Sequence, residues 1–307
     1  MYESYFGLRE PAFSLAPDPR FLWLSDTHEE GLAALCYGII RRKGFMLLTG
    51  EVGTGKTTLL RAALDRIPAD TEVALVMNTS ELSPLDLLKL VAVEFRLQGS
   101  FQSKVDYIIA LNQFLLDQLR AGLNTVLIID EAQNLDPVLL EEVRLLSNLE
   151  TDTEKLLQIV LTGQPELRHK LAAPSLRQLR QRVAIEHHVQ PLRREEVGLY
   201  LRHRVQVAGG RYESIFQPGA EPAFYSYSSG CPRMLSLLAD RVLLAAFARQ
   251  VRPVPPAMVE AKAKEMAAAP FEGLPSVDPP LAHPPLEEKA EGRAETGGLP
   301  GNRREGS

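Results

Sequence analysis

The chain has 307 residues, 45% of them hydrophobic, and a formal net charge of −5 at pH 7. This length allows one large or two modest domains with ample material for a core. No apolar run approaches the ~18 residues that a membrane-spanning helix needs, and the N-terminus lacks a secretion signal. The negative charge does not favour nucleic-acid binding by the whole chain. Cys36 and Cys231 lack metal-ligand spacing, so a reducing cytosol is the simplest location.

The first predicted helix follows a segment, residues 1–25, that is rich in aromatic residues and proline. Thr27 and Glu30 have the spacing of a capping box, which predicts a helix from there to about Arg42. The short apolar run Phe45–Thr49 then predicts a buried strand.

A phosphate-binding loop is predicted directly after this strand. The sequence GEVGTGKTT has the spacing Gly-x4-Gly-Lys-Thr, in which glycines bring backbone N–H groups close to phosphate oxygens. A helix predicted over Thr57–Arg66 adds the positive end of its dipole. Lys56 is expected to reach the β- and γ-phosphates and Thr57 to bind a magnesium ion. The predicted nucleotide-binding residues of the loop are Gly50, Glu51, Val52, Gly53, Thr54, Gly55, Lys56, Thr57 and Thr58.

Strands and helices alternate through the next part of the chain. Strands are predicted at Glu72–Met77, Thr125–Asp130, Leu156–Thr162 and Val183–Val189, and helices at Pro84–Phe95, Lys104–Arg120 and Pro137–Leu149. This alternation predicts an α/β fold with a parallel sheet flanked by helices. From about Arg193 no strand pattern is present, which predicts a small all-helical domain. The proline- and glycine-rich end is predicted to be disordered. The expected domains are 1–43, the N-terminal segment and first helix; 44–192, the α/β core; 193–267, a helical lid; and 268–307, a disordered tail.

Two adjacent acids end the third predicted strand, in LIIDEAQNL. A carboxylate at the carboxyl edge of a parallel sheet lies where ligands bind, so Asp130 is expected to hold magnesium. Glu131 is expected to deprotonate a water for attack on the γ-phosphate. The alternative is an ordinary strand-to-helix turn, where such residues are common caps. The letters DEAQ also occur in helicases, but those enzymes use two tandem sheet domains, for which this chain is too short.

Three further segments carry candidate catalytic residues. In LTGQPEL, Thr162 or Gln164 is placed to position the attacking water as a sensor, although a plain loop is an equal alternative. On a short helix in Ser175–Val183, Arg180 or Arg182 is a candidate to stabilise a neighbouring subunit's transition state, against the alternative of a solvated basic face. In GCPRML, Pro232 suits an early helix position, and Arg233 is a cation at a helix start, where an anion would relieve the conflict with the dipole.

The order of these motifs resembles that of an AAA+ ATPase, with Walker A and Walker B motifs in a P-loop NTPase fold. The block YFGLREPAFSLAPDPRFLWLSDTHEEGLAALCYGI is similar to the general secretion pathway protein A family, also called the ExeA type. The resemblance implies the phosphate-loop and acid roles given above, Gln164 or Thr162 as first sensor, Arg180 or Arg182 as arginine finger and Arg233 as second sensor. It places His28 near the nucleotide base or the phosphate loop. Full-length relatives continue into a membrane span and a peptidoglycan-binding segment, so a separate membrane or periplasmic partner is expected here.

The expected function is therefore that of a cytoplasmic ATPase that uses ATP and Mg²⁺, forms a nucleotide-dependent oligomer and remodels an export-system partner. The expected systems are bacterial secretion, pilus or surface-polysaccharide export, at the inner face of the membrane. An alternative is an ATP-dependent switch that binds duplex DNA in transposition, through the basic stretches 168–182 and 193–204. A small-molecule kinase is disfavoured because it does not need the acid pair in this form.

Overall fold

The computed structural model describes residues 1–16, 18–77 and 81–268. Met1–Ala268 form one compact unit. Within it, no helix among the described residues is both long and apolar enough to cross a membrane. Disorder was predicted for residues 268–307. Ala268 instead ends the last helix, and residues 269–307 lie outside the described residues.

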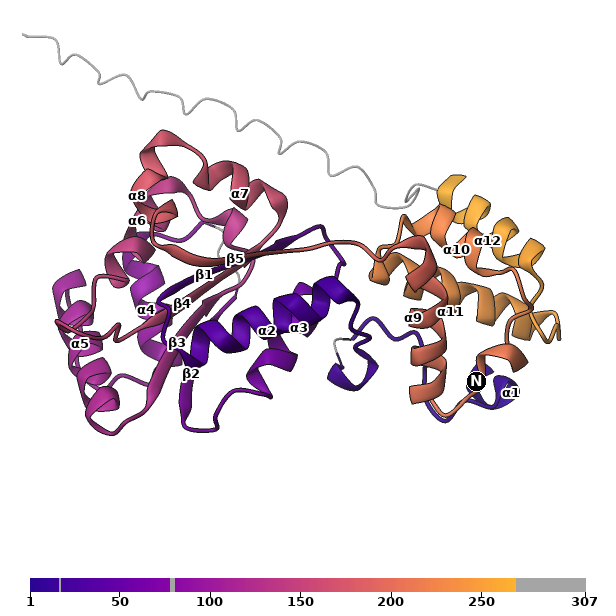
Figure 1. Cartoon of the computed structure of the whole chain (residues 1–307), viewed down its shortest axis with the longest axis horizontal. Coiled ribbons are helices and arrows are strands. Elements are labelled where there is room, and N and C mark those ends of the chain that lie inside the picture. Colours follow the sequence, from indigo (N-terminus) through magenta and orange to yellow (C-terminus); the bar gives the residue numbers. More distant parts are fainter. Residues whose placement is uncertain (17, 78–80, 269–307) are drawn as a thin grey trace, which may run out of the picture. The chain divides into compact units, whose positions relative to one another are not determined.

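Five parallel strands form one sheet, as predicted (Figure 1). They are β1 (Phe45–Gly50), β2 (Thr71–Val76), β3 (Asn124–Ile129), β4 (Gln158–Gly163) and β5 (Val183–Val189). Their order is β2-β3-β4-β1-β5, so β4 lies between the two strands that precede the phosphate loop and the acid pair. Because all strands run in the same direction, their carboxyl ends meet at one edge, where Thr49 is the register partner of Gly163.

Helices cover both faces of the sheet. The helices are α1 (Tyr2–Phe6), α2 (Asp26–Ile40), α3 (Lys56–Leu64), α4 (Pro84–Glu94), α5 (Lys104–Arg120), α6 (Pro137–Leu146), α7 (Pro165–Leu171), α8 (Arg177–Arg180), α9 (Arg194–Val207), α10 (Glu221–Ser228), α11 (Pro232–Ala248) and α12 (Pro256–Ala268). Alternate residues of β1 point to opposite faces: Met46 and Leu48 pack with α2 and α3, whereas Phe45 and Leu47 pack with α4–α8. This three-layer arrangement confirms the predicted α/β fold.

The start of the first long helix was predicted wrongly. Helix α2 begins at Asp26, and its N-cap is Ser25 rather than Thr27. Ser25 has the extended backbone of an N-cap, and its hydroxyl accepts from the His28 N–H at 3.4 Å. It also binds the His28 ring at 2.6 Å, and this contact between buried side chains stabilises the earlier start.

The helical region expected after Arg193 is present as α9–α12, and it shares its core with the N-terminal segment. Phe6, Phe13 and Phe21 are buried among the apolar side chains of these helices. The Tyr2 hydroxyl donates to Asp240 on α11. These aromatic side chains of the N-terminal segment therefore complete the hydrophobic core of the lid.

Gly230, between α10 and α11, packs on the backbone of Leu192 at a position that excludes any side chain. Its carbonyl accepts from the Leu192 N–H at 2.9 Å. A Cβ at Gly230 would lie 1.9 Å from the Leu192 carbonyl oxygen, and its φ of +80° disfavours L-residues.

We therefore expect Gly230→Ala to lower the free energy of unfolding by about 3 kcal/mol, through backbone strain and overpacking together. Gly122→Ala is the matched control, because Gly122 has a φ of +76° and no atom lies within 4 Å of the position that an alanine Cβ would take. Urea unfolding of both variants measures the difference. Equal losses would show that the contact with Leu192 does not constrain the lid.

Candidate functional site

The loop between β1 and α3 has the backbone that its glycines were predicted to allow. Gly53 and Gly55 have φ values of +81° and +100°, in the left-handed region that side chains disfavour. The buried Thr54 hydroxyl donates to the Glu51 carbonyl at 2.9 Å and closes the turn. Helix α3 starts directly after Gly55, so its first N–H groups face the loop.

Lys56 lies against its own loop. Its Nζ donates to the carbonyls of Gly50 and Glu51 at 2.7 and 2.9 Å. Burial lowers the pKa of this ammonium, while the carboxylates of Asp130, Glu51 and Glu131 oppose that shift. A partly desolvated cation beside backbone donors is suited to binding an anion such as a phosphate.

Asp130 connects the phosphate loop to the acid-bearing strand. It is 6% exposed, and it accepts from the Thr57 hydroxyl at 3.2 Å and from the Glu131 N–H at 2.9 Å. The Thr162 hydroxyl also donates to Asp130, at the oxygen that accepts from the Glu131 N–H. Thr57 and Asp130 therefore bring a hydroxyl and a carboxylate together, which are the oxygen ligands that Mg²⁺ prefers. Of the two candidate sensors, Thr162 rather than Gln164 contacts Asp130.

Glu131 follows in a backbone conformation that is uncommon for its residue type. Its φ is +52°, and it precedes the 3₁₀ helix η2 (Ala132–Asn134). The Asn134 amide donates to its carboxylate at 3.5 Å. This turn exposes the Glu131 side chain toward the cavity that Lys56 also lines.

Gln133 belongs to the site although only its neighbours were predicted. Its side-chain oxygen accepts from the Gln164 N–H at 3.1 Å, and both glutamines line the cavity. Gly163 makes this possible, because a Cβ there would lie 2.8 Å from that oxygen. In the sequence, the signal that could have identified Gln133 as a site residue was its position in DEAQ, shortly after the acid pair.

The two candidate finger arginines have different surroundings. Arg182 donates to the carbonyl and hydroxyl of Ser147, at 3.3 and 3.1 Å. Arg180 is exposed and lines a second cavity, of about 600 Å³, and within the described part of the chain its side chain forms no hydrogen bond or ion pair. Of these two arginines, Arg180 is therefore the one available to another molecule without breaking a contact among the described residues.

Arg233 and the start of α11 lie directly on the phosphate loop. The Arg233 N–H donates to the Gly53 carbonyl at 3.2 Å, and the Cys231 thiol lies 3.4 Å from the Val52 carbonyl. The exposed Arg233 side chain lines the cavity with Lys56. The predicted second sensor thus lies near the predicted phosphate-binding residues, with Pro232 at the first helical position as expected.

His28 contacts the same loop from the other side. It is 2% exposed, and its Nε2 lies 2.9 Å from the Thr54 carbonyl. Since a carbonyl only accepts, Nε2 carries the proton and Nδ1 accepts from the Ser25 hydroxyl. Burial lowers the pKa of this imidazole, with a smaller opposing effect from the Thr54 contact. A neutral His28 therefore supports the phosphate loop.

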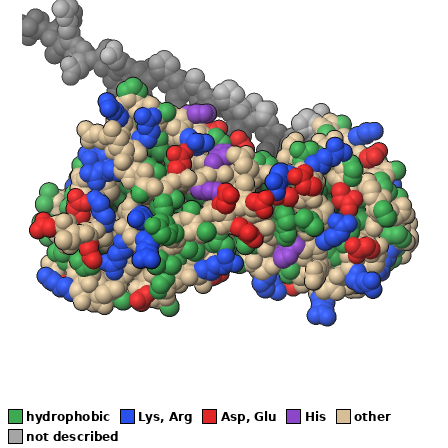
Figure 2. All heavy atoms as spheres, in the orientation of Figure 1, with side chains coloured by type: hydrophobic (Ala, Val, Ile, Leu, Met, Phe, Trp, Pro, Cys, Tyr) green, Lys and Arg blue, Asp and Glu red, His purple; other side chains and the backbone are tan. Residues whose placement is uncertain are grey.

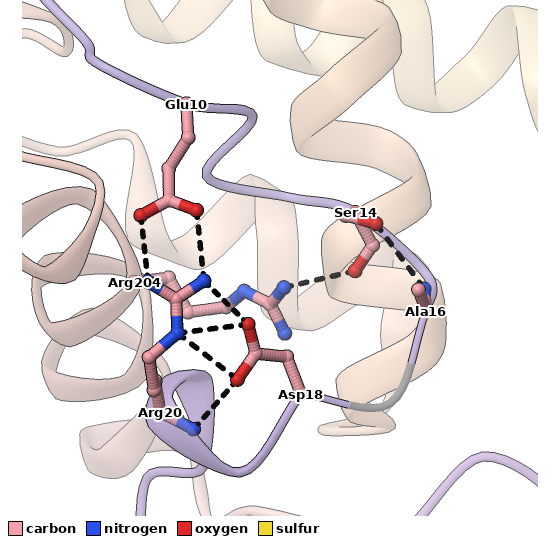
Figure 3. Close-up of polar contacts among 6 residues, drawn as sticks. All are labelled: Glu10, Ser14, Ala16, Asp18, Arg20 and Arg204. Carbon is pink, nitrogen blue, oxygen red and sulfur yellow. Dashed lines mark hydrogen bonds and ion pairs between the residues drawn. The ribbon is translucent and has the colours of Figure 1, made fainter.

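The N-terminal segment forms the remaining wall of the cavity. Ser14, Asp18 and Trp23 line it. Figure 3 shows how this wall is held: the buried Arg204 of α9 donates to the Ser14 carbonyl at 2.9 Å, and Arg20 pairs with Asp18. The whole cavity measures about 370 Å³ and is bounded by the phosphate loop, the turn that carries Glu131, the lid and this segment.

Comparison with known proteins identifies the family to which the chain belongs. Residues 40–171 match the model of the AAA domain family. General secretion pathway protein A of Aeromonas hydrophila is 48% identical over 250 residues, which cover 81% of this chain and 45% of that protein. The chain belongs to the AAA+ family and is related to general secretion pathway protein A. The family resemblance of the motifs is thereby confirmed.

Solved AAA+ structures share the fold. The ORC2 protein of Aeropyrum pernix, in ADPNP and ADP complexes, has a TM-score of 0.61 at 14% identity, over 83% of this chain and 71% of that chain. Cdc6p of Pyrobaculum aerophilum has a TM-score of 0.62 at 18% identity, over 83% and 70%. Identities this low show the fold alone. This AAA+ chain spans less than half the length of its secretion-pathway relative.

Proposed function

We propose that the chain binds ATP with Mg²⁺ in the cavity at the carboxyl edge of the sheet and hydrolyses it. The observation that carries this proposal is the contact between Thr57 and Asp130, in a cavity that Lys56 also lines. The loop N–H groups and Lys56 would bind the phosphates, and Thr57 and Asp130 would hold the metal, which neutralises phosphate charge. Glu131 takes the proton of the attacking water.

The γ-phosphate is also the group that links the sheet to the lid. Arg233 faces the cavity, and its backbone is bonded to Gly53 of the phosphate loop. An added anionic phosphate attracts the Arg233 guanidinium, and its loss on hydrolysis removes that attraction. We infer that ATP turnover moves α9–α12 relative to the sheet, and that Gln164 and Thr162 hold the water and Asp130 in place.

The proposed biological role rests on the name of the relative. General secretion pathway protein A is 48% identical in the shared part, which supports assembly or remodelling of an export-system partner by an oligomer at the inner face of the membrane. ATP hydrolysis between subunits accounts for an exposed Arg180 without a partner among the described residues, since a neighbour's nucleotide would supply its anionic partner.

The arginine contacts count against the alternative DNA-binding function. Arg168 pairs with Glu186 at 2.6 Å, Arg193 with Asp26 at 2.7 Å, and Arg202 with Glu221 at 3.1 Å. Figure 2 shows acidic and basic side chains interspersed on the face drawn. Phosphate contacts would require these arginines to leave their carboxylates.

The test of the nucleotide site is Lys56→Ala. Loss of a charge-assisted contact to phosphate is expected to weaken ATP binding about 10- to 100-fold and to abolish measurable hydrolysis. Fluorescent-nucleotide titration and phosphate release measure the two effects, with Lys43→Ala, a lysine outside the cavity, as control. Unchanged binding and turnover in Lys56→Ala would refute the assignment.

A further inference from the structure

Both ends of helix α7 contact the turn that carries Glu131. We call residues 131–135 the acid turn. At the start of α7 the Gln164 N–H donates to the Gln133 side chain at 3.1 Å. In its last turn the Lys170 ammonium donates to the carbonyls of Gln133 and Leu135, both at 2.6 Å.

These two carbonyls are not used by the hydrogen bonds that form the acid turn. The Glu131 carbonyl accepts from the Asn134 N–H at 2.9 Å, and the Ala132 carbonyl accepts from the Leu135 N–H at 3.2 Å. Leu135 is fully buried, and a buried carbonyl without a donor is destabilising. Lys170 therefore supplies the donor that the local backbone does not provide.

The charge of Lys170 has no other role among the described residues. Across residues 1–16, 18–77 and 81–268, no carboxylate lies within ion-pair distance of its ammonium. Ordering a long lysine side chain costs up to about 2 kcal/mol of rotamer freedom. A partly buried lysine that binds two carbonyls of the same turn is thus suited to fixing that turn.

The backbone of Glu131 explains why the turn needs this support. Its φ of +52° lies in the left-handed region, which costs a non-glycine residue about 1–2 kcal/mol. Such a conformation persists only where surrounding contacts determine it. Two residues, one in α7 and one at its N-cap, supply such contacts just after Glu131. Lys170 binds the carbonyls of Gln133 and Leu135. The Gln164 N–H binds the Gln133 side chain.

We propose that Lys170 is a positioning residue for Glu131, holding the acid turn so that the carboxylate keeps its orientation in the cavity. This inference rests on the proposed function, because Glu131 is the base in that reaction. Lys170 itself does not line the nucleotide cavity. Its loss therefore changes the rate of the chemical step and leaves nucleotide binding intact.

The experiment compares Lys170→Met and Lys170→Arg with the wild-type chain. Methionine keeps an apolar side chain of similar length without donors, whereas arginine keeps several donors. We expect Lys170→Met to lower kcat about 10- to 100-fold, the scale of a misplaced catalytic group, with KM within about twofold. Lys170→Arg should restore most of kcat. Lys89→Met, on an exposed lysine of α4, is the matched control.

Hydrogen exchange provides a second readout that does not depend on turnover. In Lys170→Met the amides of Asn134 and Leu135 should exchange about tenfold faster, while those of strand β1 keep their protection. Unchanged kcat and unchanged exchange overturn the proposal, and so does faster exchange throughout the sheet, which indicates general destabilisation. If the wild-type chain shows no hydrolysis, the proposed function fails, and exchange at the acid turn still decides whether Lys170 holds it. If Lys170→Met does not fold, Lys170→Gln is subjected to the same two measurements.

Discussion

Replacing Glu131 with glutamine should reduce ATP hydrolysis by about 10²- to 10⁴-fold, the range for loss of a general base. Glutamine has nearly the shape of glutamate and still accepts from the Asn134 amide, so the turn is preserved. It does not take a proton from water. Because the contacts of Lys56, Thr57 and Asp130 remain, ATP affinity should stay within about threefold of wild type.

Single-turnover phosphate release and nucleotide titration separate these two effects. Glu141→Gln is the matched control, since Glu141 is a partly exposed glutamate on α6 that pairs with Arg144 and does not line the cavity. It should leave both quantities unchanged. Hydrolysis by Glu131→Gln at the wild-type rate would show that a group other than Glu131 acts as the base.

Replacing Arg180 with alanine should lower kcat by about 10³-fold or more, the scale of an arginine finger. The side chain is exposed and makes no hydrogen bond or ion pair within the described residues, so the free energy of unfolding should change by less than about 0.5 kcal/mol. Arg182→Ala should show the reverse: a loss of stability through Ser147, at 3.1 and 3.3 Å, with a smaller effect on kcat.

A mixing experiment tests whether Arg180 acts on a neighbour. Arg180→Ala keeps an intact acid turn, and Glu131→Gln keeps an intact Arg180. If the finger acts between subunits, mixing the two inactive variants restores part of the activity, because Arg180 of one chain reaches the site of the other. Two variants that stay inactive when mixed, under conditions where they co-assemble, would show that Arg180 acts in its own chain or not at all.

The phosphate loop and the strands were predictable because they depend on neighbouring residues. GEVGTGKTT between an apolar run and a helix determines its own turn, and β5 was predicted with its observed bounds. The start of α2 was missed because Ser25 and Thr27 are both good N-caps in sequence. Burial of His28, a long-range property, favours Ser25.

The sequence by itself determined the fold class and the chemical groups of the candidate site, since strand periodicity and loop spacing are local properties of the chain. Tertiary structure decided which groups meet. It separates Arg180 from Arg182, places Thr162 on Asp130, buries Phe6, Phe13 and Phe21 in the lid core and brings Lys170 to the acid turn. These contacts join residues that are distant along the chain, and their geometry depends on how whole helices pack on the sheet, which no local pattern records.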